Sequence, residues 1–249
     1  LTEQEFGHTW GKLVTKSFNP KDIPADYNFI GMTLDVSISG TQYDRLINMY
    51  LNDIMIWRSS TIEPLNKQKT TSRVTKDITK YITLFKNEKE IELKFQLDNI
   101  IAGELDGIFT VDLKIDYYLK NQDNFKNKIP NLNDLEKVLL NSLNPYAAPD
   151  KLSPLFSIVK PKKAPLLHFP VTSKKNKPYK LESLDVDEDS QKLAMELFIS
   201  GNAAEEFWYS NVLDDYDEKF DEYGYSTLGH GPVRYLNVYL SNAYDTVKI

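Results

Sequence analysis

The chain has 249 residues, of which 41% are hydrophobic and 27% charged, and its formal net charge is −6. This length fits one large or two ordinary domains, and no stretch approaches the roughly 18 apolar residues of a membrane-spanning helix. The acidic balance excludes the phosphate backbone of a nucleic acid as the main partner, since such binding needs clustered cations. The chain has no Cys and only three His, so chemistry must come from carboxylates, Arg, Tyr and Trp.

Three segments of the first half alternate between apolar and polar side chains. They are residues 29–38, 90–97 and 109–117. A period of two predicts strands with one buried and one wet face, as in an antiparallel β-sandwich. Residues 46–51 and 54–57 are separated by Asn-Asp, which predicts a tight hairpin.

The second half is predicted to hold two further strands, at 193–200 and 233–240. Leucines at helical spacing within 131–140 predict a short helix there. A region rich in Pro and Lys, residues 144–178, has the composition of a long loop or linker.

These patterns divide the chain into three parts. We expect a first domain at 1–120, a connector containing the helix at 121–164, and the start of a second domain at 165–249. The chain begins with Leu1 and ends directly after a predicted strand, so we expect it to be a fragment of a longer protein.

Asp44 and Arg45 stand where an apolar strand is predicted to begin. A carboxylate beside a guanidinium stays ionised and is able to orient or deprotonate a water molecule. The alternative is an ordinary surface salt bridge at the start of a strand.

Two adjacent carboxylates, Glu205 and Glu206, precede a Phe-Trp-Tyr-Ser-Asn run. Neighbouring residues of an extended segment point in opposite directions, so one carboxylate would face a cleft and the other water. Contact with an aromatic ring would raise the pKa of a carboxyl group and suit it to acid–base work. The alternative is a solvated acidic loop that leads into the acidic residues 214–222.

Five segments, in this order, resemble the peptide N-glycanase A family, the peptide-N4-(N-acetyl-β-glucosaminyl)asparagine amidases of plants and fungi. The chain looks like a fungal-type member. The segments are 42–46 (QYDRL), 57–64 (WRSSTIEP), 76–81 (KDITKY), 205–211 (EEFWYSN) and 229–234 (GHGPVR).

The resemblance implies an all-β fold: an antiparallel jelly-roll β-sandwich followed by a second, incomplete jelly roll, with a short helix in the connecting insertion. It also implies hydrolysis of the amide bond between an N-linked glycan and Asn of a glycopeptide or glycoprotein, without a metal or other cofactor. It places the protein in the secretory pathway. Asp44 and Glu206 are the implied catalytic carboxylates. The implied substrate-binding residues are Arg45, Trp57, Arg58, Glu63, Glu205, Trp208, Tyr209, Asn211 and Arg234.

Two other functions fit the same residues. A catalytically inactive jelly roll could bind glycans or act as a cell-surface interaction module, since sandwiches carry many functions. A glycoside hydrolase with paired carboxylates would instead cleave between sugars.

Overall fold

The computed structural model of the chain describes residues 1–20, 27–64, 68–119, 149–154, 184, 186–224 and 228–249. These residues belong to two compact units, Leu1–Asp187 and Glu188–Ile249. The helix expected within 131–140 lies outside the described residues. The division at 120 and 164 stays a prediction.

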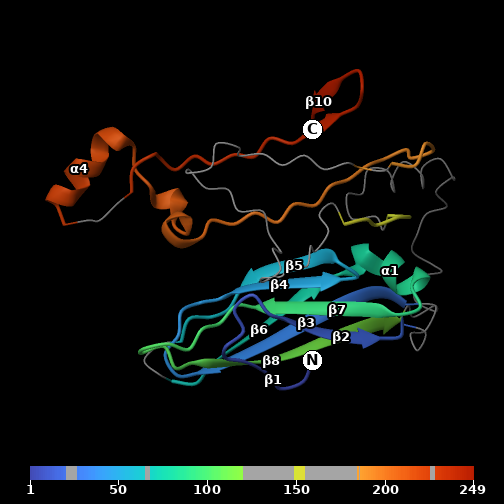
Figure 1. Cartoon of the computed structure of the whole chain (residues 1–249), viewed down its shortest axis with the longest axis horizontal. Helices are drawn as coiled ribbons and strands as arrows, with labels where there is room; N and C mark the ends of the chain where they lie inside the picture. The colour runs from blue at the N-terminus through green and yellow to red at the C-terminus, as the bar shows by residue number, and fades with distance from the viewer. Residues whose placement is uncertain (21–26, 65–67, 120–148, 155–183, 185, 225–227) are drawn as a thin grey trace, which may run out of the picture. The chain divides into compact units, whose positions relative to one another are not determined.

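The described residues of the first unit form eight strands in two antiparallel sheets (Figure 1). The strands are β1 (Gln4–Phe6), β2 (Leu13–Phe18), β3 (Tyr27–Ser39), β4 (Leu46–Leu51), β5 (Ile54–Ser60), β6 (Thr70–Asp77), β7 (Ile91–Leu97) and β8 (Ile108–Leu119). The strand order is β1-β8-β3-β6 in one sheet and β2-β7-β4-β5 in the other.

The strand pairing is that of a jelly roll. Strand β1 pairs with β8, β2 with β7, β3 with β6 and β4 with β5, as in a long antiparallel ribbon folded at the β4–β5 hairpin. Rolling this ribbon adds the pairs β3·β8 and β4·β7, which complete the two four-stranded sheets. The predicted all-β jelly-roll sandwich is therefore confirmed for this unit.

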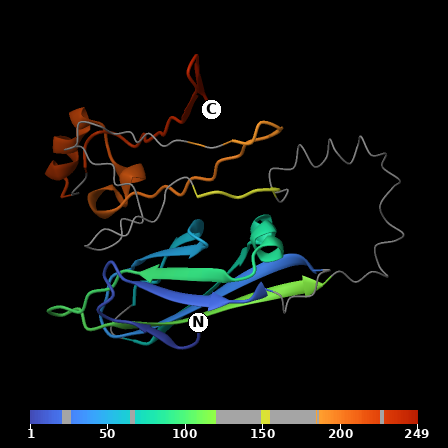
Figure 2. The same cartoon turned by 45° about the vertical axis from the view of Figure 1, so that its right-hand side comes forward.

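The core lies between the two sheets and is closed at one end by a helix. Apolar side chains at alternate strand positions fill it, such as Met32 and Phe109 from one sheet and Met49 and Phe95 from the other. Helix α1 (Ile82–Asn87) follows a 3₁₀ turn, Thr79–Tyr81, and adds Leu84 and other apolar residues to the core. In both views it lies at one end of the sandwich (Figures 1 and 2).

The strands predicted from alternation in the first half are confirmed as β3, β7 and β8, and the hairpin as β4 and β5. Asn52 and Asp53 join the hairpin with φ of 47° and 67°, the left-handed conformation that a two-residue turn between twisted strands requires.

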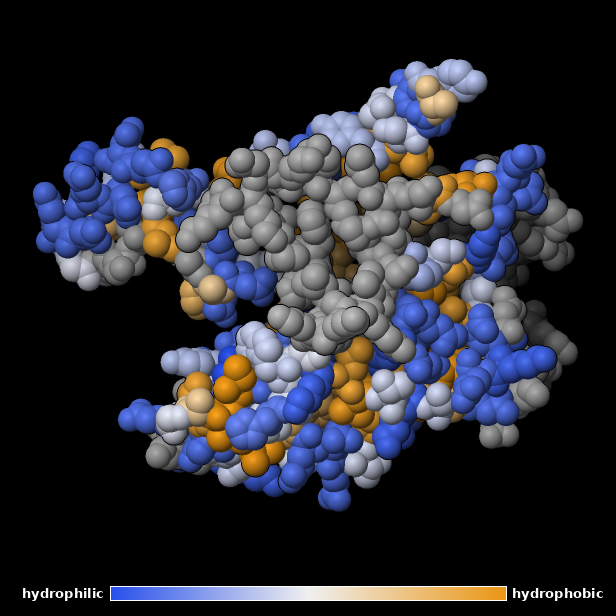
Figure 3. All heavy atoms as spheres, in the orientation of Figure 1, coloured by the Kyte–Doolittle hydropathy of each residue, from blue (hydrophilic) through white to orange (hydrophobic). Residues whose placement is uncertain are grey.

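The second unit contains little regular structure in its described residues. It has two 3₁₀ turns (Ala203–Glu205 and Trp208–Ser210), helix α4 (Asp214–Glu222) and a hairpin of β9 (Tyr239–Ser241) and β10 (Thr246–Lys248). In the space-filling view α4 presents mainly hydrophilic residues (Figure 3).

Both strands predicted in this half are wrong. Residues 193–200 are extended without ladder pairing, and within 233–240 only the last two residues enter a strand. A run of apolar residues does not make a strand unless another strand supplies the hydrogen-bonding partners. None of the helices in the described ranges has both the length and the apolar character needed to cross a bilayer.

Candidate functional site

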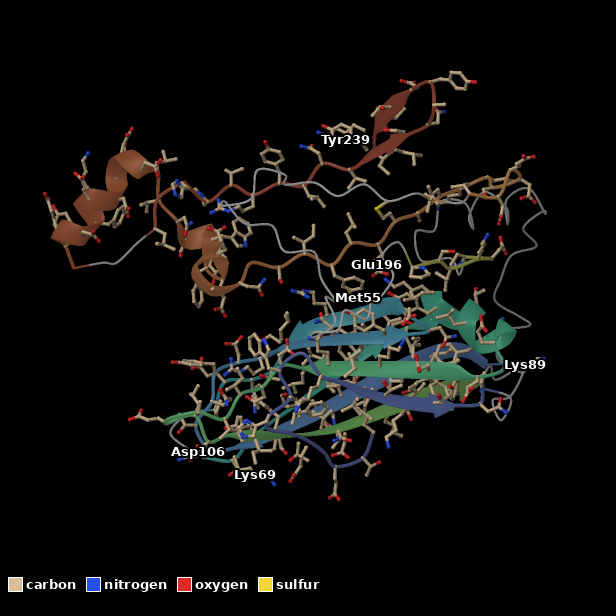
Figure 4. The ribbon with its side chains drawn as sticks, in the orientation of Figure 1. Met55, Lys69, Lys89, Asp106, Glu196 and Tyr239 are labelled. Atoms are coloured by element: carbon tan, nitrogen blue, oxygen red, sulfur yellow. The ribbon has the colours of Figure 1, made fainter. Side chains whose placement is uncertain are left out.

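Four connections of the jelly roll meet at one end of the sandwich. Odd-numbered and even-numbered strands run in opposite directions, so all connections from an odd to the next even strand lie at the same end. These connections are residues 7–12, 40–45 and 98–107 and the described part of 61–69. Asp106 lies at this end and Lys89 at the opposite end (Figure 4). We call this the loop end.

Backbone hydrogen bonds tie these connections to one another. The N–H groups of Thr9, Gly107 and Thr61 donate to the carbonyls of Asn99, Thr41 and Arg45, at 3.0, 2.9 and 2.8 Å. Gly107 allows the close approach, because a Cβ there would lie 2.9 Å from Cβ of Gln42. The loop end is thus a connected surface made from segments far apart in the sequence.

Asp44 lies at the loop end, two residues before β4, and is partly exposed. The hydroxyl of Ser60 donates to its Oδ2 at 2.8 Å. The register of β4 with β5 pairs Leu46 with Ser60, which brings the hydroxyl to the carboxylate. One oxygen of Asp44 is thereby oriented by a neighbouring strand.

The neighbouring Arg45 does not form the salt bridge with Asp44 that we considered. Its Nη2 donates to Oε1 of buried Gln42 at 2.6 Å, and its guanidinium lies 5.7 Å from the ring centroid of Tyr43. Adjacent residues of an extended segment project to opposite sides, which explains the separation of the two charges. Arg45 therefore organises the Gln42–Tyr43 side of the loop.

Trp57 is a core residue. Its side chain is only 5% exposed and belongs to the cluster between the sheets, where its strand position faces Met49. A buried ring does not offer its face to a sugar, so the structure gives no support to the substrate-binding role of Trp57, which stays a prediction. Glu63 is exposed in the connection after β5.

Arg58 begins a row of hydrogen bonds on the outer face of its sheet. Its Nη1 donates to Oδ1 of Asn48 at 2.8 Å, Nδ2 of Asn48 donates to Oε1 of Gln96 at 3.1 Å, and Nε2 of Gln96 reaches both carboxylate oxygens of Asp98 at 3.0 Å. Burial lowers the pKa of Arg58 and raises the pKa of nearby Tyr50. We call these four residues the amide row.

In the second unit, Arg234 holds Glu205 with two hydrogen bonds, from Nε at 2.6 Å and Nη2 at 3.0 Å. Its Nη1 donates to the carbonyls of Gly231 and Val233. The bond to Arg234 lowers the pKa of Glu205, contrary to the raised value expected for a carboxyl beside aromatic rings. Glu205 and Arg234 thus form an ion pair with two hydrogen bonds.

The other predicted residues of this unit lie along the two 3₁₀ turns. Glu206 follows the first turn and is exposed. Trp208 and exposed Tyr209 meet edge to face, with ring centroids 6.1 Å apart. Asn211 is buried, and its Nδ2 has no hydrogen-bond partner among the described residues.

The convergence of Asp44 and Glu206 on one site remains a prediction. Asp44 belongs to the first unit and Glu206 to the second. Within the described ranges, no three His, Asp or Glu side chains are arranged to hold a metal ion.

Sequence reasoning missed several residues of the loop end and its sheet. Gln42 and Ser60 stand inside recognised segments but carried no assigned role, and Asn48 and Gln96 occupy polar strand positions that alternation assigns to solvent. A hydroxyl next to an exposed acid has no sequence signature. Only the strand register reveals it.

The described residues define an all-β protein whose first unit is a jelly roll with acidic, basic and aromatic side chains at its loop end. The family described as "Peptide N-acetyl-beta-D-glucosaminyl asparaginase amidase A" matches residues 1–248. The chain belongs to this family.

A curated relative, "Peptide-N4-(N-acetyl-beta-glucosaminyl)asparagine amidase A" of Prunus dulcis, is 25% identical over 241 residues. The match covers 94% of this chain, and the chain spans 39% of the length of that relative.

Two solved structures are similar at low level. One is a family 35 carbohydrate binding module from an environmental isolate, with TM-score 0.27, 15% identity, and coverage of 44% of this chain and 69% of that one. The other is dimeric latent PorU from Porphyromonas gingivalis, with TM-score 0.27, 12% identity, and coverage of 46% and 11%. The fold assignment rests on the strand pairing and not on these matches.

Proposed function

We propose that the protein hydrolyses the amide bond between an N-linked glycan and the Asn of a glycopeptide or glycoprotein in the secretory pathway. The family match over residues 1–248 carries this proposal. The partly exposed carboxylate of Asp44, oriented by Ser60 at the loop end, supplies a group suited to the reaction.

In the proposed step, water attacks the side-chain carbonyl carbon of Asn and gives a proton to Asp44. The carbon–nitrogen bond breaks, and the leaving nitrogen gains a proton and departs as a glycosylamine, which then loses ammonia. Glu206 would take part in the second proton transfer of the reaction or bind the sugar core. Arg45 would bind substrate, and the step requires no metal. General acid–base groups of this kind contribute about 10²–10⁴-fold to rate.

A glycopeptide incubated in heavy-oxygen water tests the reaction. Amide hydrolysis places the heavy oxygen in a new Asp carboxylate of the peptide, which mass spectrometry detects. Asp44→Asn is expected to lower kcat by about 10²-fold or more. The matched control is Glu104→Gln, an exposed acid in the 98–107 connection of the same end, which should leave the rate unchanged. Equal loss in both variants would contradict the assignment of Asp44.

The alternative, a catalytically inactive glycan-binding module, predicts binding without turnover and binding that survives Asp44→Asn. A glycoside hydrolase would leave a sugar or a shortened glycan on the Asn and place the heavy oxygen on the released sugar. The same mass measurement separates all three functions.

A further inference from the structure

Two large aromatic side chains at the loop end are exposed to solvent. Trp10 is 57% exposed and Tyr43 is 58% exposed. Each ring has an apolar face that a flat ligand can cover, and both residues stand at the end of the sandwich that carries Asp44. The burial of Trp57 leaves the sugar-stacking role in this unit open to them.

The two residues precede strands of the same sheet. Strands β2 and β4 both flank β7, with Leu13 opposite Gln96 and Ile47 opposite Leu97. Trp10 and Tyr43 each stand three residues before their strand. Since neighbouring strands lie about 4.8 Å apart, the starts of β2 and β4 are separated by about 10 Å.

Both loops are anchored to the segment that follows β7. The N–H of Gly11, next to Trp10, donates to Oδ1 of Asp98 at 2.8 Å. On the other side, Nε2 of Gln42 donates to the carbonyl of Ile100 at 3.0 Å, and its Oε1 accepts from the N–H of Tyr43 at 3.1 Å. The two aromatic positions are therefore held by hydrogen bonds to one common segment.

Polar groups accompany the rings. Tyr43 precedes Asp44, and the guanidinium of Arg45 lies 5.7 Å from its ring centroid, a distance at which a cation steadies an aromatic ring. A pyranose has apolar C–H faces and a rim of hydroxyl and amide groups. Two aromatic faces with nearby carboxylates match that chemistry.

We propose that Trp10 and Tyr43 form a sugar-binding subsite at the loop end, which takes the pyranose faces of the glycan next to Asp44. The choice of the glycan as ligand rests on the proposed function. The exposed rings beside Asp44 suit a ligand with flat apolar faces and a polar rim.

Titration calorimetry of the 249-residue chain with an N-acetylglucosamine dimer tests this subsite. Wild type is expected to bind, and Trp10→Ala or Tyr43→Ala to weaken binding at least about tenfold, as expected for loss of a stacking ring. Trp10→Phe and Tyr43→Phe keep a ring and should keep most of the affinity. The control is Tyr118→Ala, which removes a ring that is 51% exposed on β8. Circular dichroism of each variant checks the fold.

The outcomes separate this inference from the proposed function. Dimer binding that depends on Trp10 and Tyr43, in a chain without amidase activity, supports the subsite and contradicts the enzyme. Amidase activity with a KM that neither alanine variant changes supports the enzyme and overturns the subsite. Failure of wild type to bind the dimer, or equal binding by all variants, also overturns it.

Discussion

At the scale of single residues, the adjacent acids Glu205 and Glu206 have different surroundings. Glu205 is held by Arg234, and the direction of its pKa shift follows from that bond. Glu206 is exposed and follows the turn. Glu205 is thus engaged by Arg234, its substrate-binding role stays a prediction, and Glu206 stays the proposed catalytic group.

The pair predicts a pH dependence with a definite sign. Because the folded pKa of Glu205 is lowered, the pair stabilises the folded state above the ordinary Glu pKa, and this contribution disappears as the pH falls through the folded value. We expect an NMR titration to show the Glu205 carboxyl below the ordinary range. Arg234→Gln should return the pKa toward that range.

Exchanging the two charges gives the control for that titration. In the double variant Glu205→Arg/Arg234→Glu, a carboxyl again faces a guanidinium, so its pKa should again be low. An unchanged pKa in Arg234→Gln would show that Arg234 is not the cause of the shift.

At the scale of secondary-structure elements, the amide row has a fixed direction. A guanidinium only donates and a carboxylate only accepts, so the amide oxygens of Asn48 and Gln96 must both point toward Arg58. Gln96→Glu would place a second carboxylate against Asp98 on a buried position. We expect a loss of about 3 kcal/mol in the free energy of unfolding at neutral pH, measured by urea denaturation.

The same substitution at an exposed position is the control. Gln68→Glu lies in a surface connection and should change stability by less than about 0.5 kcal/mol. The loss from Gln96→Glu should shrink at acidic pH, where the new carboxyl is protonated. A loss that is independent of pH would point to packing instead of charge.

The contact between the two sheets gives a packing prediction. Phe95 is fully buried, and its ring lies 5.3 Å from that of Phe6. Phe95→Ala is expected to cost about 3–5 kcal/mol of unfolding free energy. Exposed Val74→Ala on β6 is the comparison, with an effect below about 0.5 kcal/mol. Similar losses in both would contradict the location of the core.

The sequence predicts a strand correctly where alternating side chains occur in a segment that also has a neighbouring strand to pair with. Strands β3, β7 and β8 alternate along most of their length and are predictable, whereas β6 has Val74 as its sole apolar residue and gives no such signal. Residues 193–200 are rich in apolar side chains, yet Ile199 is 69% exposed and the segment has no ladder. The pattern of side chains indicates which face of a strand is buried, but it does not indicate which strands pair with it.

The same limit applies to the candidate site. The recognised segments located Asp44, because an acid next to an apolar run is visible in sequence. They also suggested Trp57 for the ligand, because composition alone does not tell a core aromatic from a surface aromatic. Trp10 and Tyr43 became candidates only when the structure showed that both are exposed in loops before strands that flank β7.

At the scale of the whole molecule, buried apolar side chains are unevenly distributed. Among the described residues, the fully buried apolar side chains all lie between Phe6 and Leu113. The second unit shows none, and its helix α4 has nine residues without a buried side chain. A helix this short is marginal without packing.

Hydrogen exchange should show this difference. We expect the amides of β3 and β8, which pair along twelve positions, to be the slowest, and those of α4 to exchange within the first time points. Peptides covering 214–222 and 108–119 in one mass-spectrometry experiment provide the comparison. Equal protection of the two would show that α4 is stabilised by packing that the described residues lack.

The jelly-roll topology also affects how the loop end can change during evolution. Its odd-to-even connections emerge together, outside the ladders that fix the register, so an insertion in one of them lengthens a loop without disturbing a strand. Descendants of one ancestor can in this way acquire different ligand preferences on an unaltered scaffold. Gly107 sets one boundary to such drift, because any larger residue there forces the loops apart.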